Sequence, residues 1–239
     1  MKALILAAGF GTRLGSLTKE TPKALIKVGS TTIIDHNIRK LVEIGISEIL
    51  INSHYLADQI ESYLIAQSYP IKVSTFFEQE LLGTAGTLKA RLGLFGDDDF
   101  IVMHGDNYFQ SELNSLVKAH VDRSTSTYMT MATFKTDRPE SCGTVLINEA
   151  GIVVDFFEKV HNSPSNEANS AIYVFSHEAL GVIKSLSEKE TDISKDLIPK
   201  MLGRIQAHHL DGDFIDIGTP SGLSRAIQSH ALKQSINRK

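Results

Sequence analysis

Cysteine, tryptophan and long apolar stretches are scarce or absent in this chain of 239 residues. Cys142 is the one cysteine, so no disulfide can form within the chain, and nothing in the sequence indicates an oxidising compartment. No stretch approaches the roughly 20 apolar residues of a membrane span, and the apolar run at 3–8 is too short for the core of a signal peptide. We therefore expect a cytoplasmic protein with no membrane partner.

A surplus of positive charge is also lacking. Lysine and arginine number 24 against 28 aspartates and glutamates, which gives a formal net charge of −4. The basic residues do not gather into a stripe, so we expect no nucleic-acid partner. With 42% hydrophobic and 22% charged residues the composition is that of an ordinary folded protein, which excludes disordered and collagen-like classes.

Motifs for zinc and for nucleophilic catalysis are missing as well. The sequence contains no HExxH, no GxSxG and no Cys/His cluster. His208 and His209 are adjacent, so in a strand they would point to opposite faces of the sheet. Zinc chemistry and a Ser/His/Asp triad are therefore not expected.

Short apolar runs alternate with helical periodicity through the first half of the chain. Such β-α-β alternation predicts right-handed crossovers and a Rossmann-like α/β fold with a mainly parallel central sheet flanked by helices. In such sheets ligands bind beyond the carboxyl ends of the strands. The predicted strands are 2–8, 48–53, 71–77 and 100–104, and the predicted helices start near 34, at 58–67 and at 84–94.

In the second half predicted strands predominate, and they do not alternate regularly with helices. No repeat, low-complexity block or linker divides the chain, so we expect one domain over residues 1–239. The predicted strands are 128–134, 144–147, 152–157, 171–175 and 213–217, with a helical stretch at 195–202. The expected parts are a first part at about 1–125, a second part at about 126–222 and a C-terminal helix at 220–236.

A glycine-rich segment follows the first predicted strand. Gly9 and Gly11 permit positive φ and close backbone approach, so the loop can turn several N–H groups toward phosphate oxygens, and Arg13 adds a fork of donors. Lys23 follows a proline that restrains its backbone. The segment lacks the Lys-Ser/Thr ending of a Walker loop and the third glycine of a dinucleotide motif, so by itself a purely structural turn is an equal alternative.

Two aspartates stand at the ends of predicted strands, 110 residues apart. Asp106 follows an apolar strand and a glycine, and Asp216 follows a second strand-like segment. Carboxylates in such positions can hold a hard divalent cation, which keeps waters and phosphate oxygens as its other ligands. Capping of the following turn or helix is the structural alternative for each.

Six segments, in order, are similar to motifs of one family. Residues 6–29, LAAGFGTRLGSLTKETPKALIKVG, resemble the signature LAxGxGTRLxPLTxxxPKxLxxV of the sugar-1-phosphate nucleotidyltransferases, the pyrophosphorylases that make NDP-sugars. Ser16, Cys142 and Val160 depart from the family pattern, the last two in the sugar-binding part. The other segments that carry the resemblance are LLGTAGTL at 81–88, HGDNYF at 104–109, FEK at 157–159, NSAIY at 169–173 and FIDIGTP at 214–220.

The resemblance implies a reaction and a set of site residues, and it makes the part at about 1–125 nucleotide-binding and the part at about 126–222 sugar-phosphate-binding. It implies Mg²⁺-dependent transfer of a nucleotidyl group from an NTP to a sugar 1-phosphate, with Arg13 and Lys23 catalytic and Asp106 and Asp216 holding Mg²⁺. The implied nucleotide-binding residues are Leu6, Ala7, Ala8, Gly9, Gly11, Thr12, Arg13, Lys23, Glu80, Gly83, Thr84 and Ala85. The implied substrate-binding residues are Asn107, Gly143, Glu158, Lys159 and Asn169.

Several alternatives stay open at this stage. The likeness is greatest to mannose- or heptose-1-phosphate guanylyltransferases, which favours GTP, but uridylyl and thymidylyl transfer to a hexose 1-phosphate are alternatives. A cytidylyltransferase for phosphocholine or another non-sugar phosphate is a further one, because the same N-terminal signature can precede a different acceptor pocket. A protein of a different class, a non-catalytic sensor of nucleotide or sugar phosphate, is the last alternative. We expect a monomer or a homodimer.

Overall fold

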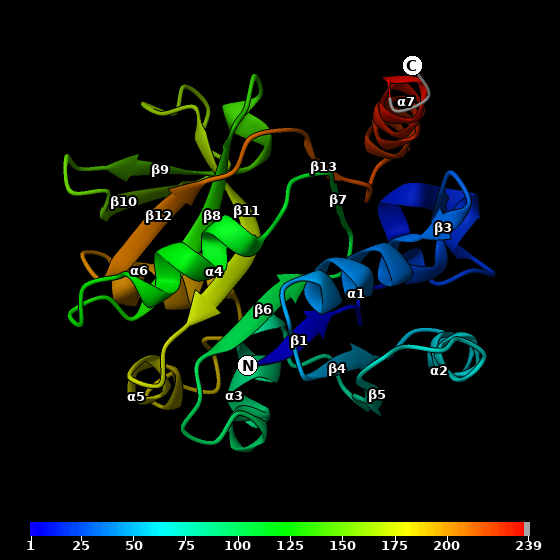
Figure 1. Ribbon diagram of the computed structural model, residues 1–239, viewed down its shortest axis with the longest axis horizontal. Helices are drawn as coiled ribbons and strands as arrows, with labels where there is room; N and C mark the ends of the chain where they lie inside the picture. Colours follow the sequence, from blue (N-terminus) through cyan, green and yellow to red (C-terminus); the bar gives the residue numbers. More distant parts are fainter. Residues whose placement is uncertain (237–239) are drawn as a thin grey trace. The chain divides into compact units, whose positions relative to one another are not determined.

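The computed structural model describes residues 1–236, and the chain divides into two compact units (Figure 1). Unit 1 comprises Met1–Leu4, Leu81–Met103 and Glu112–Asp211, and unit 2 comprises Ile5–Glu80, His104–Ser111 and the stretch from Gly212 onward. Each unit is thus assembled from separate segments of the chain. The expectation of one domain over residues 1–239 stays a prediction.

Unit 1 is built on β-strands that pair mostly antiparallel. Its strands follow the order β10-β9-β11-β6-β1, and β8 pairs with both β11 and β12. β11 runs antiparallel to β6, β8 and β9, while β12 runs parallel to β8. The strands are β1 (Lys2–Leu6), β6 (Phe100–His104), β8 (Met129–Lys135), β9 (Gly143–Ile147), β10 (Val153–Glu158), β11 (Glu167–Phe175) and β12 (Ile205–His209).

Helices cover these strands and close a core of aromatic and aliphatic side chains. Figure 1 shows α4 lying across β8 and β11, against which it packs. The rings of Phe95 and Phe100 stack with centroids 3.9 Å apart, and Phe175 stacks on Phe100 at 5.3 Å. The helical elements are α3 (Thr84–Ala90), η3 (Leu92–Leu94), α4 (Asn114–Val121), η4 (Pro139–Ser141), α5 (Ala179–Lys184), the π-turn η5 (Ile193–Leu197) and α6 (Ile198–Met201).

Unit 2 combines a parallel strand pair with small two-stranded ribbons. β4 (Glu48–Ser53) and β5 (Lys72–Phe77) run parallel in register from Glu48 opposite Lys72 to Ser53 opposite Phe77. The ribbons are β2 (Lys27–Val28) with β3 (Thr31–Thr32), and β7 (Asn107–Phe109) with β13 (Phe214–Asp216). The helical elements are η1 (Thr12–Thr18), η2 (Lys23–Leu25), α1 (Ile33–Glu43), α2 (Ala57–Ile65) and α7 (Pro220–Ile236).

The local sequence explains where α1 begins and ends. Thr32 is the N-cap, and its hydroxyl accepts a hydrogen bond from the amide of Asp35 at 3.3 Å. Ile34, Ile38 and their neighbours on one face are fully buried, which is the 3.6-residue pattern of an amphipathic helix. Gly45 follows the helix with φ of +77°, a conformation that suits glycine.

The predicted fold class is confirmed: the chain is an α/β protein with a mostly parallel central sheet flanked by helices. Two elements have the predicted bounds, Glu48–Ser53 and Phe100–His104. β1 ends at Leu6 rather than at residue 8, β11 begins at Glu167 rather than at 171, and the helix expected at 195–202 is a π-turn followed by one short helical turn. Elements that the periodicity did not indicate are β2, β3, β7, β12, α4 and α5.

The missed elements are short or have little apolar periodicity. Pairing partners far away in the sequence stabilise β7 and β12, whereas β2 and β3 pair with each other. Among residues 1–236, none of the helices is both long and apolar enough to cross a membrane.

Candidate functional site

The glycine-rich segment forms a loop at the end of β1 in unit 2. The amide of Ala7 donates to Oδ1 of Asn52 at 2.5 Å, which fixes the start of the loop against β4. Gly11 has φ of +67°, and a Cβ there would lie 3.0 Å from Cγ2 of Thr18. Both observations explain glycine at position 11 by the fold alone. Gly9 differs, because its φ is not positive and a Cβ there would meet nothing within 4 Å.

Lys23 is held in place by its backbone and by its buried stem. Pro22 has φ of −56° and ψ of 141°, and its carbonyl accepts from the amide of Leu25 at 2.9 Å to close the turn η2. The Lys23 side chain is only 9% exposed. Its ammonium therefore has a restricted range of positions.

The two predicted metal ligands both contact this ammonium. Nζ of Lys23 lies 2.5 Å from Oδ2 of Asp106 and 3.2 Å from Oδ1 of Asp216. The pairing of β7 with β13 brings the two aspartates together. Asp216 is opposite Asn107, and the amide of Ile217 donates to the carbonyl of Asp106 at 3.1 Å. Two aspartates 110 residues apart in sequence are thus neighbours in unit 2.

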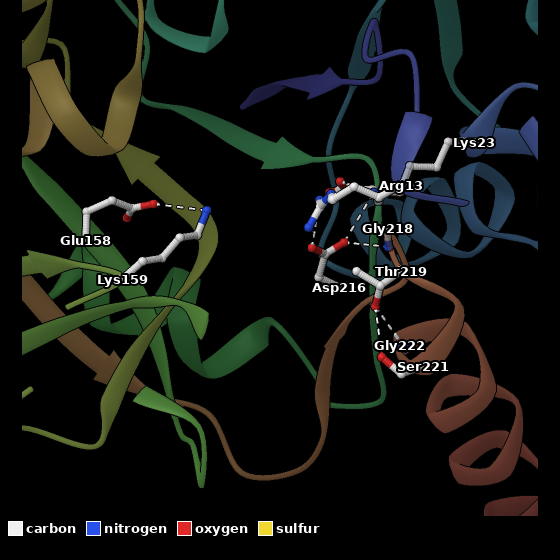
Figure 2. A network of polar contacts seen from close by, with 10 residues as sticks. Arg13, Lys23, Glu158, Lys159, Asp216, Gly218, Thr219, Ser221 and Gly222 are labelled. Carbon is white, nitrogen blue, oxygen red and sulfur yellow. Dashed lines mark hydrogen bonds and ion pairs between the residues drawn. The ribbon is translucent and has the colours of Figure 1, made fainter. Parts of the chain in front are cut away.

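Arg13 and Gly218 complete this group, which we call the charge cluster: Arg13, Lys23, Asp106, Asp216 and the backbone of Gly218. Nη2 of Arg13 lies 3.2 Å from Oδ2 of Asp216, and the amide of Gly218 donates to Oδ1 of Asp216 at 2.6 Å (Figure 2). A Cβ at Gly218 would lie against Nζ of Lys23, and 2.7 Å from both Nη2 of Arg13 and Oδ1 of Asp216. Glycine at 218 keeps the centre of the cluster free of a side chain.

The electrostatics of the cluster keep the Asp106 carboxylate charged. Burial by itself would raise the pKa of Asp106, but the Lys23 ammonium, His104 and hydrogen bonds from Lys23 and the backbone hold that pKa below its ordinary value. Two carboxylates face two cations, so the cluster is close to neutral. Asp216 and Arg13 are the more exposed members, at 46% and 62% of their side chains, against 33% for Asp106.

The cluster fits a divalent cation by its donor set. Carboxylate oxygens of Asp106 and Asp216 already converge on a single cationic atom, and oxygen donors are what Mg²⁺ prefers. Residues 1–236 contain no group of three or more His, Cys, Asp or Glu side chains arranged to hold a metal. A cation here would therefore take most of its remaining ligands from water or phosphate.

A pair of residues next to the loop was missed from the sequence. Asn52, which accepts from Ala7, donates through Nδ2 to Oε1 of Glu78 at 3.1 Å, and both side chains are at least 95% buried. The available signal was their position, since each lies at the carboxyl end of a parallel strand or directly after it. Glu80, the residue that the motif indicated, is exposed.

The predicted substrate residues of unit 1 gather at the end of β10. Nζ of Lys159 lies 3.3 Å from Oε1 of Glu158 (Figure 2). The amide of Lys159 donates to the carbonyl of Cys142 at 3.2 Å. Gly143 is opposite Glu158 in the β9–β10 pair, and a Cβ there would lie against the ring of Phe156 and 2.8 Å from Oε2 of Glu158. Glycine at 143 is thus a packing requirement.

Lys159 and Asn169 both lie where the backbone departs from regular strand geometry. Lys159 has φ of +54°, a left-handed conformation that is uncommon for a side-chain-bearing residue. Asn169 lies where the β11–β8 register shifts, with Oδ1 accepting from the amide of Ala171 at 2.9 Å and Nδ2 donating to the hydroxyl of Tyr173 at 2.8 Å. Burial raises the pKa of Tyr173, so its hydroxyl stays protonated.

Two of the three departures from the family pattern, Cys142 and Val160, lie in unit 1. Cys142 is half-buried, and burial raises the pKa of its thiol, which disfavours the nucleophilic thiolate. Ala171, in the NSAIY segment, has φ of +56°, which is uncommon for a residue with a Cβ.

The motif residues at the start of α3 have structural partners in unit 1. Gly83 has φ of +75°, and the amide of Ala85 donates to the carbonyl of Thr191 at 2.8 Å. The Thr84 hydroxyl accepts from the amide of Ile193 at 2.8 Å. A role of these residues in nucleotide binding stays a prediction.

Fold and site together define an α/β protein in which cations and carboxylates converge beside a glycine loop at the ends of strands. The chain belongs to the nucleotidyl transferase family, since the family model described as "Nucleotidyl transferase" matches residues 2–233.

Named relatives and a solved structure extend over most of the chain. The mannose-1-phosphate guanylyltransferase catalytic subunit beta of Drosophila pseudoobscura is 32% identical over 98% of the chain, and the UTP–glucose-1-phosphate uridylyltransferase of Synechocystis is 31% identical over 99%. The chain spans 64% and 65% of the lengths of these relatives. A Bacillus anthracis protein assigned as a glucose-1-phosphate thymidylyltransferase, solved with sucrose, aligns with a TM-score of 0.86 at 26% identity, covering 95% of this chain and 94% of its own.

Proposed function

We propose that this protein transfers a nucleotidyl group from an NTP to a sugar 1-phosphate, giving an NDP-sugar and pyrophosphate. The observation that carries the proposal is the charge cluster: Arg13 and Lys23, Asp106, and Asp216 come from three separate segments and converge beside the glycine loop. Family membership and the names of the relatives support the same reaction.

The chemistry asks the protein for positioning and charge neutralisation. An oxygen of the sugar 1-phosphate attacks the α-phosphorus of the NTP, the bond from that phosphorus to the bridging β-phosphate oxygen breaks, and pyrophosphate leaves with the electron pair. The attacking phosphate is already anionic near neutral pH, so no side chain has to remove a proton. What remains is to hold two repelling anions in line.

The residues of unit 2 would bind and orient the triphosphate. Gly9 lets phosphate oxygens approach the backbone, which agrees with the open space around its Cα. Arg13 and Lys23 would stabilise the triphosphate and the departing pyrophosphate. Mg²⁺ held by Asp106 and Asp216 would neutralise phosphate charge. The other residues that we propose for the nucleotide are Leu6, Ala7, Ala8, Gly11, Thr12, Glu80, Gly83, Thr84 and Ala85.

The residues of unit 1 would bind the sugar 1-phosphate. The Lys159 ammonium would pair with the phosphate, while Glu158 would accept hydrogen bonds from sugar hydroxyls. Asn169 retains a free N–H on an amide whose orientation Tyr173 fixes, so it can donate to a sugar hydroxyl. Gly143 of unit 1 and Asn107 of unit 2 complete the proposed set.

GTP is the nucleotide that we favour, because the motif pattern and the guanylyltransferase relative agree. Uridylyl and thymidylyl transfer are the alternatives that the other two comparisons favour. We propose the cytoplasm as location, and a monomer or homodimer stays a prediction.

A substrate matrix tests the proposal. Four NTPs are each combined with a panel of sugar 1-phosphates and phosphocholine, and pyrophosphate release is measured with and without Mg²⁺. We expect Mg²⁺-dependent release for one NTP with one or a few sugar phosphates. Release with phosphocholine alone would mean that the acceptor is not a sugar 1-phosphate. No release from any pair would reject the enzyme assignment.

A further inference from the structure

The ammonium of Lys23 stands where the two carboxylates could share a metal ion. It contacts Oδ2 of Asp106 at 2.5 Å and Oδ1 of Asp216 at 3.2 Å, so one atom bridges both candidate ligands. Arg13 contacts the other oxygen of Asp216. In this state the protein neutralises its own carboxylates.

This bridge is a built feature rather than a surface ion pair. The Lys23 side chain is 9% exposed and its backbone follows a proline, whereas exposed ion pairs are mobile and contribute little. Gly218 leaves the space that Nζ occupies, since a Cβ at that position would lie against Nζ. The buried side chain, the backbone that follows Pro22 and the two carboxylates thus restrict the position of the ammonium.

We propose that Lys23 is an internal counter-ion that competes with the divalent cation for Asp106 and Asp216 until a triphosphate draws it away. The inference rests on the proposed function. A divalent ion and an ammonium repel each other, so both cannot occupy the space between the same two carboxylates. A bound triphosphate gives the ammonium another anion, which frees the carboxylates for the metal.

Coupling of metal and triphosphate binding follows. If Lys23 opposes metal binding in the free protein and triphosphate removes that opposition, each ligand strengthens the binding of the other by the same factor. The free protein then binds metal weakly, and metal and nucleotide bind together.

The first test measures Mn²⁺ binding to the full chain by the loss of the free-Mn²⁺ EPR signal, with no nucleotide present. The variants are Lys23→Met and Lys23→Gln, each checked for fold by circular dichroism, and the matched control is Lys19→Met, an exposed lysine nearby. We expect Mn²⁺ to bind the Lys23 variants roughly tenfold tighter or more, as is typical of coupling between sites, and Lys19→Met to bind like wild type. Equal or weaker binding by folded Lys23 variants would overturn the proposal.

A second measurement uses the wild-type protein and so does not depend on a variant folding. Lysines are acylated with acetic anhydride and quantified by mass spectrometry, without Mn²⁺ and with saturating Mn²⁺. Displacement predicts that Mn²⁺ increases the acylation of Lys23 several-fold and leaves Lys19 unchanged. Saturation with Mn²⁺ and no change at Lys23 would contradict the inference.

These outcomes are separate from those of the substrate matrix. Tighter Mn²⁺ binding by Lys23→Met without pyrophosphate release from any pair would reject the proposed function and keep the counter-ion. Pyrophosphate release with unchanged Mn²⁺ binding would keep the function and reject the counter-ion.

Discussion

The charge cluster of unit 2 and the Glu158–Lys159 pair of unit 1 are both ion pairs at strand ends, but they are constructed differently. In the cluster, one nearly buried ammonium bridges two carboxylates from separate segments. In the pair, two sequence neighbours meet, and the Lys159 side chain is 60% exposed. The first geometry depends on the fold around it, whereas the second depends on one strand end.

The motif departures follow the same division. The N-terminal signature of unit 2 differs only at Ser16, while unit 1 carries the departures Cys142 and Val160. Charge cancellation on phosphates imposes the same demand for any nucleotidyl transfer, whereas the acceptor differs from one enzyme to another. On the proposed function, unit 2 would supply the common chemistry and unit 1 would select the acceptor.

The largest effect should come from Lys23→Ala. Loss of a transition-state donor should lower kcat by roughly 10²-fold or more, measured by pyrophosphate release with saturating substrates. Lys19→Ala is the control and should retain wild-type rates. A Lys23→Ala enzyme with near wild-type turnover would remove the reason to rank the cluster above the Glu158–Lys159 pair.

Gly218→Ala should come next. Its methyl group would press on Lys23 and lie 2.7 Å from Arg13 and Asp216, so the charges would separate and kcat should fall roughly tenfold to hundredfold. Gly181→Ala is the matched control, because a Cβ at Gly181 meets nothing within 4 Å and its φ is not positive. Equal activity of the two variants would show that the cluster tolerates displacement.

Stability in acid should depend on His120 in unit 1. Burial, with a smaller effect of Arg123, lowers the pKa of His120 to about 4, while an unfolded histidine has a pKa near 6.5. The unfolded state therefore takes up the proton first, so this contribution is complete above pH 6.5 and is lost as the pH falls toward 4. Between pH 7 and pH 5 the free energy of unfolding should fall by about 2 kcal/mol from this group.

Urea unfolding at both pH values checks this. The fall should be smaller by that amount in His120→Gln and unchanged in His177→Gln, whose side chain is exposed. An undiminished fall in His120→Gln would assign the acid sensitivity to other groups.

Lys159→Ala should have a smaller effect of a different kind. Because this ammonium is exposed and would hold the acceptor phosphate, its loss should raise KM for the sugar phosphate roughly tenfold and change kcat less. Steady-state kinetics with the sugar-phosphate concentration varied distinguishes the change in KM from the change in kcat. A loss in kcat as large as that of Lys23→Ala would erase the contrast between the two regions.

The smallest expected effect is an increase in stability. Ala171 has φ of +56°, which costs a residue with a Cβ about 1–2 kcal/mol, so Ala171→Gly should raise the free energy of unfolding by about 1 kcal/mol after glycine's greater chain entropy is counted. Urea unfolding measures it. A destabilised Ala171→Gly would mean that contacts of the Ala171 methyl outweigh the backbone strain.

Sequence reasoning reached the fold class because buried parallel strands and amphipathic helices have patterns of their own, as in Glu48–Ser53 and Ile33–Glu43. It did not reach β7 or β12, because neither has a local pattern strong enough to predict a strand. Their stability comes from partners: β13 for β7, and β8 for β12.

For the site, the sequence supplied the identities of the charged residues but not their grouping. Asn52 and Glu78 were overlooked because a lone polar residue at a strand end resembles any solvated loop, and only the fold shows that they hold Ala7.

By itself, the sequence determined the α/β class, the glycine loop and the charged residues that follow strands, because periodicity and motif spacing are local properties of the chain. Only the tertiary structure decided that Asp106 and Asp216 share one ammonium, because the pairing of β7 with β13 joins segments more than 100 residues apart. Coulomb interactions depend on separation in space, and a sequence specifies separation only along the chain.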